Sequence, residues 1–363
     1  MNDVTGKAMQ PKATADEGLC GPWPNCALQR PGIGCRSCRP LNASVRRTHN
    51  GYALTSVHRG EPMKQVAGLA NRMGPLLLLM TAVVALNAQQ VADTNFRPLI
   101  EKPGYPAGKG PVVLIDEAHS NFHTATGRYL PFAELLRRDG YVVQASAGQF
   151  TAEVLKAGRV LVISNAMNEK NQNDPNAPPL SAFTAQEIAA VRDWVAGGGS
   201  LLLIADHPPW SGAAEDLGKA LGVRFLNGVA WFENEKSSSG RLIFRRSDGT
   251  LMDHPVTKGI DEVATFTGSS FQLEAAGQPL LVFGPDVYSV KVKDDPNPVP
   301  LKGHLQGAVL PFGKGRVAVF GEAAMFSAQL SGPTKNPMGM NAAIAKQNPQ
   351  FLLNVMHWLT GLL

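Results

Sequence analysis

Short apolar runs that alternate with amphipathic stretches are the feature that most constrains the fold of this chain. The runs occupy residues 112–115, 141–144, 160–163, 201–204 and 316–320. Each run is almost continuously apolar, as expected of a strand that is buried on both faces of a parallel sheet. Strands that alternate with helices indicate right-handed crossovers within one sheet. The pattern therefore predicts an α/β fold with a doubly wound, mostly parallel sheet.

Local signals place the helices and mark a change of character late in the chain. Thr184 and Glu187 form a capping-box pattern before an amphipathic helix, and Asn348-Pro349 opens the last helix. Between 228 and 310, short β-like runs are separated by Gly, Pro, Asp and Ser. This change predicts a β-rich insertion or edge near 228–310.

A segment near the N-terminus has the pattern of a secretory signal peptide. Lys64 and Arg72 supply positive charge, residues 76–86 are an unbroken apolar run, and Ala88 is a small residue at the expected cleavage point. The apolar run is too short to span a bilayer, which takes about 20 residues. We therefore expect a signal peptide over 63–88 and no membrane span in the mature protein.

A signal peptide acts at the N-terminus of a chain, so the residues that precede it need an explanation. We expect translation to start at Met63 or Met73, and residues 1–62 to be disordered or untranslated. A linker at 89–110 then leads to a body at 111–363. These boundaries predict an exported protein, either periplasmic or secreted.

The cysteines and the charge of the chain concentrate in the same N-terminal region. All four cysteines (Cys20, Cys26, Cys35 and Cys38) precede residue 40, and the last two have zinc-knuckle spacing. The surrounding residues lack apolar periodicity, so disorder is favoured over a zinc site. Residues 1–62 hold 8 basic and 4 acidic residues, which leaves 26 basic and 25 acidic residues in the rest of the chain. A body this close to neutral has no basic surface for nucleic acid.

Polar side chains follow four of the predicted strands, where open α/β sheets bind their ligands. They are Asp116, Glu117, His119, Asn121 and His123 after the first strand, Ser164 and Asn165 after the third, Asp206 and His207 after the fourth, and Glu322 after the last. Because parallel strands end at the same edge, we expect these residues to line one pocket for a small polar ligand.

Two enzyme classes are excluded by missing motifs. The string at 116–119, Asp-Glu-Ala-His, names one class of helicases, but the nearest approach to a Walker A loop, at 104–110, is one residue short and lacks the Ser or Thr that binds Mg²⁺. No nucleotide is therefore expected. The chain also lacks the G-x-S-x-G elbow of serine hydrolases.

Two hypotheses remain for the histidines. His119 and His123 have the i, i+4 spacing of a zinc pair, and Asp206 could complete a divalent metal site. Alternatively, His119 is part of a hydrogen-bonded network and bonds Asp116 or Asp206 through one ring nitrogen. We favour the network, with no cofactor, and keep the metal as the alternative.

Four segments of the body resemble a known group of proteins. These are "IDEAHSNFH", "FTAQEIAAVRDWVAGGGSLLLIADHPP", "DHPVTKGIDEV" and "GRVAVFGEAAMFSAQ" with the ending "NPQFLLNVMHWL". Together they resemble an uncharacterised bacterial domain family of the class I glutamine amidotransferase-like superfamily. That family is similar to trehalose-utilisation-type domains and to auxiliary domains of gliding-motility ABC transporters. The resemblance covers about residues 110–363 and implies a flavodoxin-like sheet.

One departure from that superfamily limits the function. Its amidotransferases use a Cys nucleophile, whereas residues 63–363 contain no cysteine, so glutamine cannot be attacked by that route. We expect an exported domain that binds a small polar ligand or serves as a scaffold for a cell-envelope protein. Its ligand-binding residues would be Glu117, Asn121, His123, Asn165, His207 and Glu322. The alternative is a hydrolase, with or without metal, that uses Asp116, His119 and Asp206.

Overall fold

The structure, a computed structural model, describes residues 90–363 except 175–176 and 292–294. The expectations for residues 1–62 and for a signal peptide at 63–88, together with all four cysteines, lie outside the described residues.

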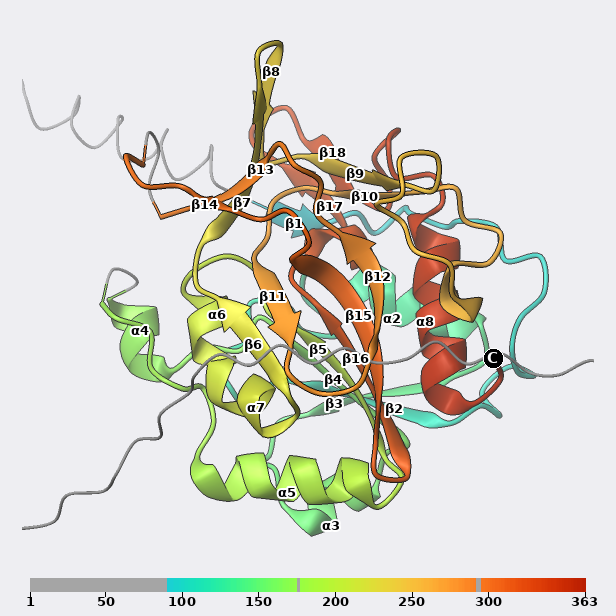
Figure 1. Ribbon diagram of the computed structural model, residues 1–363. Coiled ribbons are helices and arrows are strands. Elements are labelled where there is room, and N and C mark those ends of the chain that lie inside the picture. The colour runs from blue at the N-terminus through green and yellow to red at the C-terminus, as the bar shows by residue number, and fades with distance from the viewer. Residues whose placement is uncertain (1–89, 175–176, 292–294) are drawn as a thin grey trace, which may run out of the picture. The chain divides into compact units, whose positions relative to one another are not determined.

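Nine of the described strands form one mixed sheet (Figure 1). Five of them run parallel in the spatial order β3-β2-β4-β5-β16, and β15, β11 and β6 continue the sheet with antiparallel pairing. β12 also pairs with β15. The strands are β2 (Val112–Asp116), β3 (Val142–Ser146), β4 (Val160–Ser164), β5 (Ser200–Ile204), β6 (Val223–Leu226), β11 (Ser270–Leu273), β12 (Gln278–Val282), β15 (Leu305–Phe312) and β16 (Gly315–Phe320).

The five parallel strands coincide with the five apolar runs of the sequence. β4 and β5 are buried at every position, because helices cover both of their faces. The prediction of an α/β fold with a largely parallel sheet is therefore confirmed.

Helices cover the two faces of this sheet. Val113 of β2 belongs to a core cluster with α2 and α8, whereas the next residue, Leu114, belongs to a second cluster with α3, α5 and α7. Successive residues of a strand point to opposite faces, so one apolar run serves both cores. The helices are α2 (Leu130–Arg138), α3 (Ala152–Lys156), α4 (Glu169–Asn173), α5 (Ala185–Ala196), α6 (Trp210–Ala213), α7 (Glu215–Ala220) and α8 (Asn348–Thr360), with short 3-10 turns η1 (Pro255–Thr257) and η2 (Ala324–Phe326).

Three small antiparallel sheets lie toward one end of the main sheet, at the top of the view in Figure 1. One has the order β1-β17-β18, one pairs β9 with β10, and one has the order β14-β13-β7-β8, of which β8 lies in a projecting hairpin (Figure 1). Their strands are β1 (Gln90–Ala92), β7 (Val229–Asn234), β8 (Ser237–Ser239), β9 (Leu242–Arg245), β10 (Glu262–Thr265), β13 (Val287–Val290), β14 (Val299–Pro300), β17 (Ala328–Ser331) and β18 (Asn336–Gly339).

The region near 228–310 is β-rich as predicted, but it is not one insertion. β7, β8, β9, β10, β13 and β14 form separate small sheets, whereas β11, β12 and β15 belong to the main sheet. Their apolar character is interrupted by polar residues, Gly or Pro, as at Gln272 of β11, Gln278 and Pro279 of β12, and Gln306 and Gly307 of β15.

Residues 90–110, expected as a linker, are attached to the body. β1 pairs with β17, with Gln90 opposite Ser331, and the backbone N–H of Gly104 donates to Asp139 at 2.7 Å. This attachment brings Gln90 into the candidate site described below.

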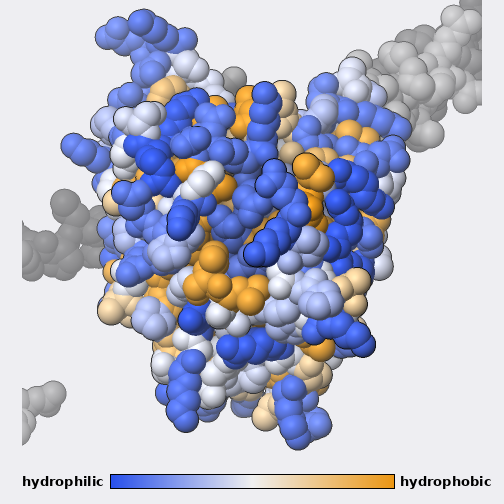
Figure 2. Space-filling view, turned by 90° about the vertical axis from the view of Figure 1, so that its right-hand side faces the viewer, coloured by the Kyte–Doolittle hydropathy of each residue, from blue (hydrophilic) through white to orange (hydrophobic). Residues whose placement is uncertain are grey.

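A helix that spans a membrane must be long and predominantly apolar. Among the helices of the described residues, none has the length and apolar content that a membrane span requires. Figure 2 shows a face dominated by hydrophilic side chains, with hydrophobic ones gathered in small groups. Groups of this kind are ordinary on protein surfaces.

Candidate functional site: a polar pocket beside a buried histidine network

Four strand ends bring polar side chains to the carboxyl edge of the sheet. β2 ends at Asp116 and β4 at Ser164, whereas Asp206 follows β5 and Glu322 follows β16. All four side chains are buried. Burial of this many polar groups at one edge requires that each finds hydrogen-bond partners.

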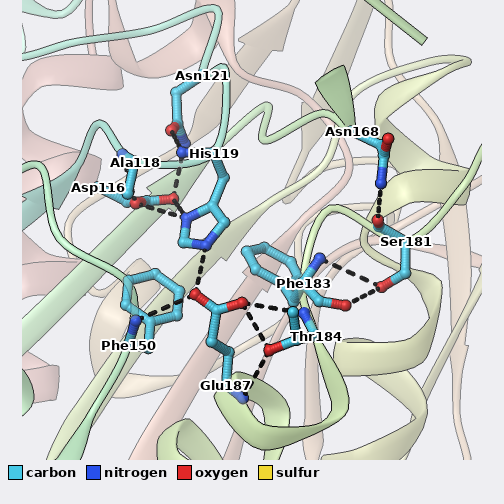
Figure 3. A network of polar contacts seen from close by, with 10 residues as sticks. All are labelled: Asp116, Ala118, His119, Asn121, Phe150, Asn168, Ser181, Phe183, Thr184 and Glu187. Carbon is cyan, nitrogen blue, oxygen red and sulfur yellow. Dashed lines mark hydrogen bonds and ion pairs between the residues drawn. The ribbon is translucent and has the colours of Figure 1, made fainter. Parts of the chain in front are cut away.

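His119 lies between two buried carboxylates (Figure 3). Its Nδ1 is 2.9 Å and 3.0 Å from the two carboxylate oxygens of Asp116, and its Nε2 is 2.9 Å from Oε1 of Glu187. An ionised carboxylate can only accept, so a ring that bonds carboxylates on both sides donates from both nitrogens and is positively charged. The rings of Phe150 and Phe183 lie 4.6 Å and 4.8 Å from the imidazole and exclude water from these bonds.

The Asp116 side of this arrangement fixes the loop between β2 and α2. Asp116 also accepts from the backbone N–H of Ala118 at 3.1 Å and from Nδ2 of Asn121 at 2.9 Å. The amide oxygen of Asn121 accepts in turn from the backbone N–H of His119 at 3.0 Å. Asp116, His119, Asn121 and Glu187, here called the His119 network, thus satisfy one another.

Glu187 connects this network to helix α5. Its Oε2 accepts from the backbone N–H and the hydroxyl of Thr184 at 3.0 Å and 2.8 Å, and its Oε1 accepts from the N–H of Phe150 at 3.1 Å. The expected capping box is therefore confirmed. Its glutamate has a second task, holding His119, which the local pattern could not reveal because the two residues are 68 positions apart.

The pKa values agree with a charged ring between two anions. Burial alone would lower the pKa of His119, but the hydrogen bonds and charges of Asp116 and Glu187 outweigh it and raise that pKa above 6.5. Burial raises the pKa of Glu187, yet the bonds from Thr184, His119 and Phe150 bring it below 4.5. Both shifts favour the charged forms, a cationic His119 beside an anionic Glu187.

A pocket of about 140 Å³ opens at the same edge of the sheet. It is lined by Gln90, Phe122, His123, Asn165, Asp206, His207, Trp210, Thr267, Ala324, Gln329 and Met338, and we call it the Asp206 pocket. A water molecule occupies about 30 Å³ in the liquid, so the space suits a ligand of only a few non-hydrogen atoms.

Three polar atoms of the lining residues have no partner among the described residues. They are Nε2 of His123, Nε1 of Trp210 and Oε1 of Gln329. His123 is 2% exposed and Gln329 is 1% exposed. An unpaired buried polar atom costs about 1–3 kcal/mol, and these three atoms belong to residues that line one pocket.

Burial also sets the charge of His123. Its Nδ1 is 3.2 Å from the hydroxyl of Ser164. Burial, and to a smaller extent the charge of Arg128, lowers its pKa to about 3. His123 is therefore neutral near pH 7, and its pKa is shifted in the opposite direction to that of His119.

Asn165 supports Asp206 through a strained backbone. It has a φ of +49°, a left-handed conformation that is uncommon outside glycine but that Asn tolerates. Its backbone N–H donates to Ile204 and its side-chain oxygen accepts from the N–H of Asp206, both at 3.0 Å. Such strain often marks functional sites.

Asp206 and Glu322 meet at the turn after β16. Asp206 accepts from the N–H of Ala323 at 3.3 Å, and Glu322 accepts from those of Ala324 and Met325 at 2.8 Å and 2.7 Å. Burial, and next the charge of Asp206, raises the pKa of Glu322 well above 4.5 although these bonds oppose the shift. Asp206 thus faces the pocket, and Glu322 is an acid buried near it.

The structure divides the predicted site residues between these two places. Asp116, His119 and Asn121 belong to the His119 network, whereas His123, Asn165, Asp206 and His207 line the pocket. Glu117 does neither, since it accepts from the N–H of Ala125 at 2.7 Å within its own loop. The expectation of one pocket lined by all of them is therefore wrong.

The proposed metal ligands are divided in the same way. Both nitrogens of His119 bond carboxylates, while His123 and Asp206 line the pocket. Over the described residues, no cluster of three or more His, Cys, Asp or Glu side chains is placed to hold a metal ion.

Sequence reasoning missed seven of the eleven residues that line the pocket, among them Trp210, Phe122, Gln90 and Gln329. Trp210 ends the string "DHPPW" and could have been included with Asp206, because it follows the same strand. Phe122 was passed over as an apolar residue among polar ones. Gln90 and Gln329 come from the paired strands β1 and β17, and no local signal places these strands at the carboxyl edge.

Comparison with known proteins yields fold-level similarity only. No protein-family model matches the chain, and no curated protein matches it. Among solved structures, the mmIFT52 N-terminal domain has a TM-score of 0.49 at 15% identity, over 68% of this chain and 97% of that one.

Two further structures are similar at the same low level. A cytoplasmic protein from Salmonella typhimurium has a TM-score of 0.42 at 15% identity, over 69% of this chain and 99% of that one. A ThuA-like protein from Bacteroides uniformis has a TM-score of 0.39 at 17% identity, over 72% of this chain and 94% of that one.

Proposed function

We propose that this protein is an exported domain that binds a small polar ligand in the Asp206 pocket. The observation that carries the proposal is the group of three unpaired buried polar atoms, on His123, Trp210 and Gln329, in the wall of one pocket. A ligand that bonds them would remove their desolvation cost, and this gain becomes binding free energy.

The His119 network acts as the support of this pocket. It fixes the loop that carries Phe122 and His123, and the N–H of Phe122 donates to the backbone oxygen of Asn165 at 3.0 Å. A ligand site gains affinity when its residues are held before binding. We therefore assign His119 a positioning role rather than direct contact with the ligand.

The hydrolase alternative receives less support from this geometry. A general base needs a free nitrogen within reach of the substrate, whereas both nitrogens of His119 are bonded to carboxylates. Asp206 alone of the three candidate catalytic residues lines the pocket.

The finer features of the proposal rest on sequence together with fold. The order of the five parallel strands, β3-β2-β4-β5-β16, supports a flavodoxin-like arrangement, as expected of a glutamine amidotransferase-like domain without the nucleophilic Cys. The signal-peptide pattern supports export. A scaffold role for a cell-envelope protein is compatible with the same pocket.

A pocket-filling variant tests ligand binding. Ala324 is buried and lines the pocket, so Ala324→Leu should fill it, while Ala342→Leu, at another buried alanine outside the pocket, is the matched control. The full chain and both variants are screened by thermal shift against small polyols, amino alcohols, amino acids and hydroxy acids.

We expect at least one compound class to raise the Tm of the parent and of Ala342→Leu but not of Ala324→Leu. Equal responses of all three proteins to every compound would overturn the proposal.

A further inference from the structure

The lining of the Asp206 pocket disfavours an anion. It includes the carboxylate of Asp206 and contains no Lys or Arg. Arg128 is nearby, with its guanidinium 3.8 Å from the ring centroid of Phe122, but it is not a lining residue. An anionic ligand would meet Asp206, with Glu322 buried near it, without a cation in the wall.

Three acceptors belong to residues that line the pocket. Besides Asp206, the orientation of Gln329 is fixed because the hydroxyl of Ser327 donates to the backbone oxygen of Ala324 at 3.2 Å and therefore accepts from Nε2 of Gln329 at 2.7 Å. This leaves Oε1 of Gln329 as an unpaired acceptor. His123 is the third acceptor in the tautomer whose Nδ1–H donates to Ser164.

Aromatic rings and one donor complete the wall. The ring of Trp210 lies 5.1 Å from that of Phe122 and 5.0 Å from that of His207, between centroids. Ring faces attract cations, and Trp does so most strongly. The indole N–H of Trp210 has no partner among the described residues and can only donate.

These groups match a particular combination on the ligand. A primary ammonium has three N–H donors, as many as the acceptors of the pocket, and a hydroxyl supplies the acceptor that the N–H of Trp210 lacks. We propose that the Asp206 pocket binds a small hydroxyl-bearing primary amine, with its ammonium against Asp206 and a hydroxyl against Trp210. This inference rests on the ligand-binding function proposed above.

Matched probes of equal or similar size test this ligand class by calorimetry on the full chain at pH 7 in an amine-free buffer. Serinol (2-aminopropane-1,3-diol) carries the ammonium and two hydroxyls. Glycerol replaces the ammonium by a hydroxyl, isopropylamine lacks the hydroxyls, and lactate supplies an anion. We expect serinol to bind at least about tenfold more tightly than each of the others, which corresponds to about 1.4 kcal/mol.

Two variants test whether Asp206 binds the ammonium and whether the N–H of Trp210 binds a hydroxyl. Asp206→Asn should reduce the affinity for serinol at least about tenfold, to about the affinity of the unaltered protein for glycerol. Trp210→Phe keeps the ring but removes the N–H, so it should reduce serinol affinity toward that of isopropylamine. If Asp206→Asn does not fold, the comparison of serinol with glycerol on the unaltered protein decides alone.

The outcomes separate this inference from the proposed function. If glycerol or lactate binds as tightly as serinol, the proposal of an amine ligand is overturned, whereas the proposal that the pocket binds a small polar ligand is kept. If none of the four probes binds, the proposal of an amine ligand is also overturned. The proposed ligand-binding function is then tested by the screen with Ala324→Leu, which includes other ligand classes.

Discussion

Two histidines in one loop show how surroundings decide the role of a side chain. His119 and His123 are four residues apart, yet the pKa of His119 is raised by two carboxylates while burial lowers the pKa of His123 to about 3. Their spacing in the sequence suggested a shared metal, because spacing carries no information about the distant Glu187. Only the fold shows that one ring is charged and the other neutral.

Removal of His119 should destabilise the protein strongly. His119→Ala leaves Asp116 and Glu187 buried without their cation, a change that costs about 3 kcal/mol. Urea denaturation measures the loss, and His207→Ala is the control, because His207 is at the same edge and partly exposed. A smaller loss for His119→Ala than for His207→Ala would show that the network does not stabilise the fold.

His123 should make the fold sensitive to acid. Its pKa is lowered in the folded state, so between about pH 6.5 and pH 3 the unfolded chain binds a proton that the folded chain does not, and stability falls as the pH falls. From pH 7 to pH 5 the parent should lose about 2 kcal/mol more than His123→Asn. The titrations of His119 and Glu187 occur in both proteins and therefore cancel in this comparison. Equal losses of stability in the parent and in His123→Asn would contradict the lowered pKa of His123.

At the scale of elements, the N-terminus of α5 joins a helix cap to the site. Thr184→Ala removes the hydrogen bond that the Thr184 hydroxyl donates to the Glu187 carboxylate and the one that it accepts from the backbone N–H of Glu187, and it loosens the carboxylate that holds His119. An ordinary cap is worth about 1 kcal/mol. We expect Thr184→Ala to cost more than Thr151→Ala, which removes the exposed cap of α3, in thermal or urea unfolding.

A double-mutant cycle measures the coupling in this element. The cost of Thr184→Ala should be smaller when His119 is already Ala, because the two residues share Glu187. Additive costs within about 0.3 kcal/mol would mean that the cap and the network are independent.

The elements also show what the sequence could and could not predict. The parallel strands were predictable because burial on both faces leaves a continuous apolar run, as in β5, and the cap of α5 was predictable because its partners are three residues apart. β11, β12 and β15 were not assigned to the main sheet, because their pairing joins residues far apart in sequence. Likewise Asp206 was a candidate from its strand end, whereas Gln329 depends on the pairing of β17 with β1.

At the scale of the whole molecule, the proposed cleavage site of the signal peptide lies directly before the first described strand, β1. Cleavage after Ala88 would leave Gln89 as the first residue, and β1 begins at Gln90. Such a cut preserves the whole of β1, its pairing with β17 and the contribution of Gln90 to the pocket. A cut only a few residues later would remove them.

We therefore expect a chain expressed from Met63 to be exported and to begin near Gln89, as determined by mass spectrometry of the mature protein. A protein that begins at Gln89 should melt at the temperature of the full chain, because the cut leaves every described strand complete. A protein that begins at Asp93 lacks β1 and should melt several degrees lower, since about 1 kcal/mol corresponds to about 2–4 °C at this size. Any part of residues 1–62 in the mature protein, or equal melting of the Gln89 and Asp93 forms, would contradict this account of how processing and pocket fit together.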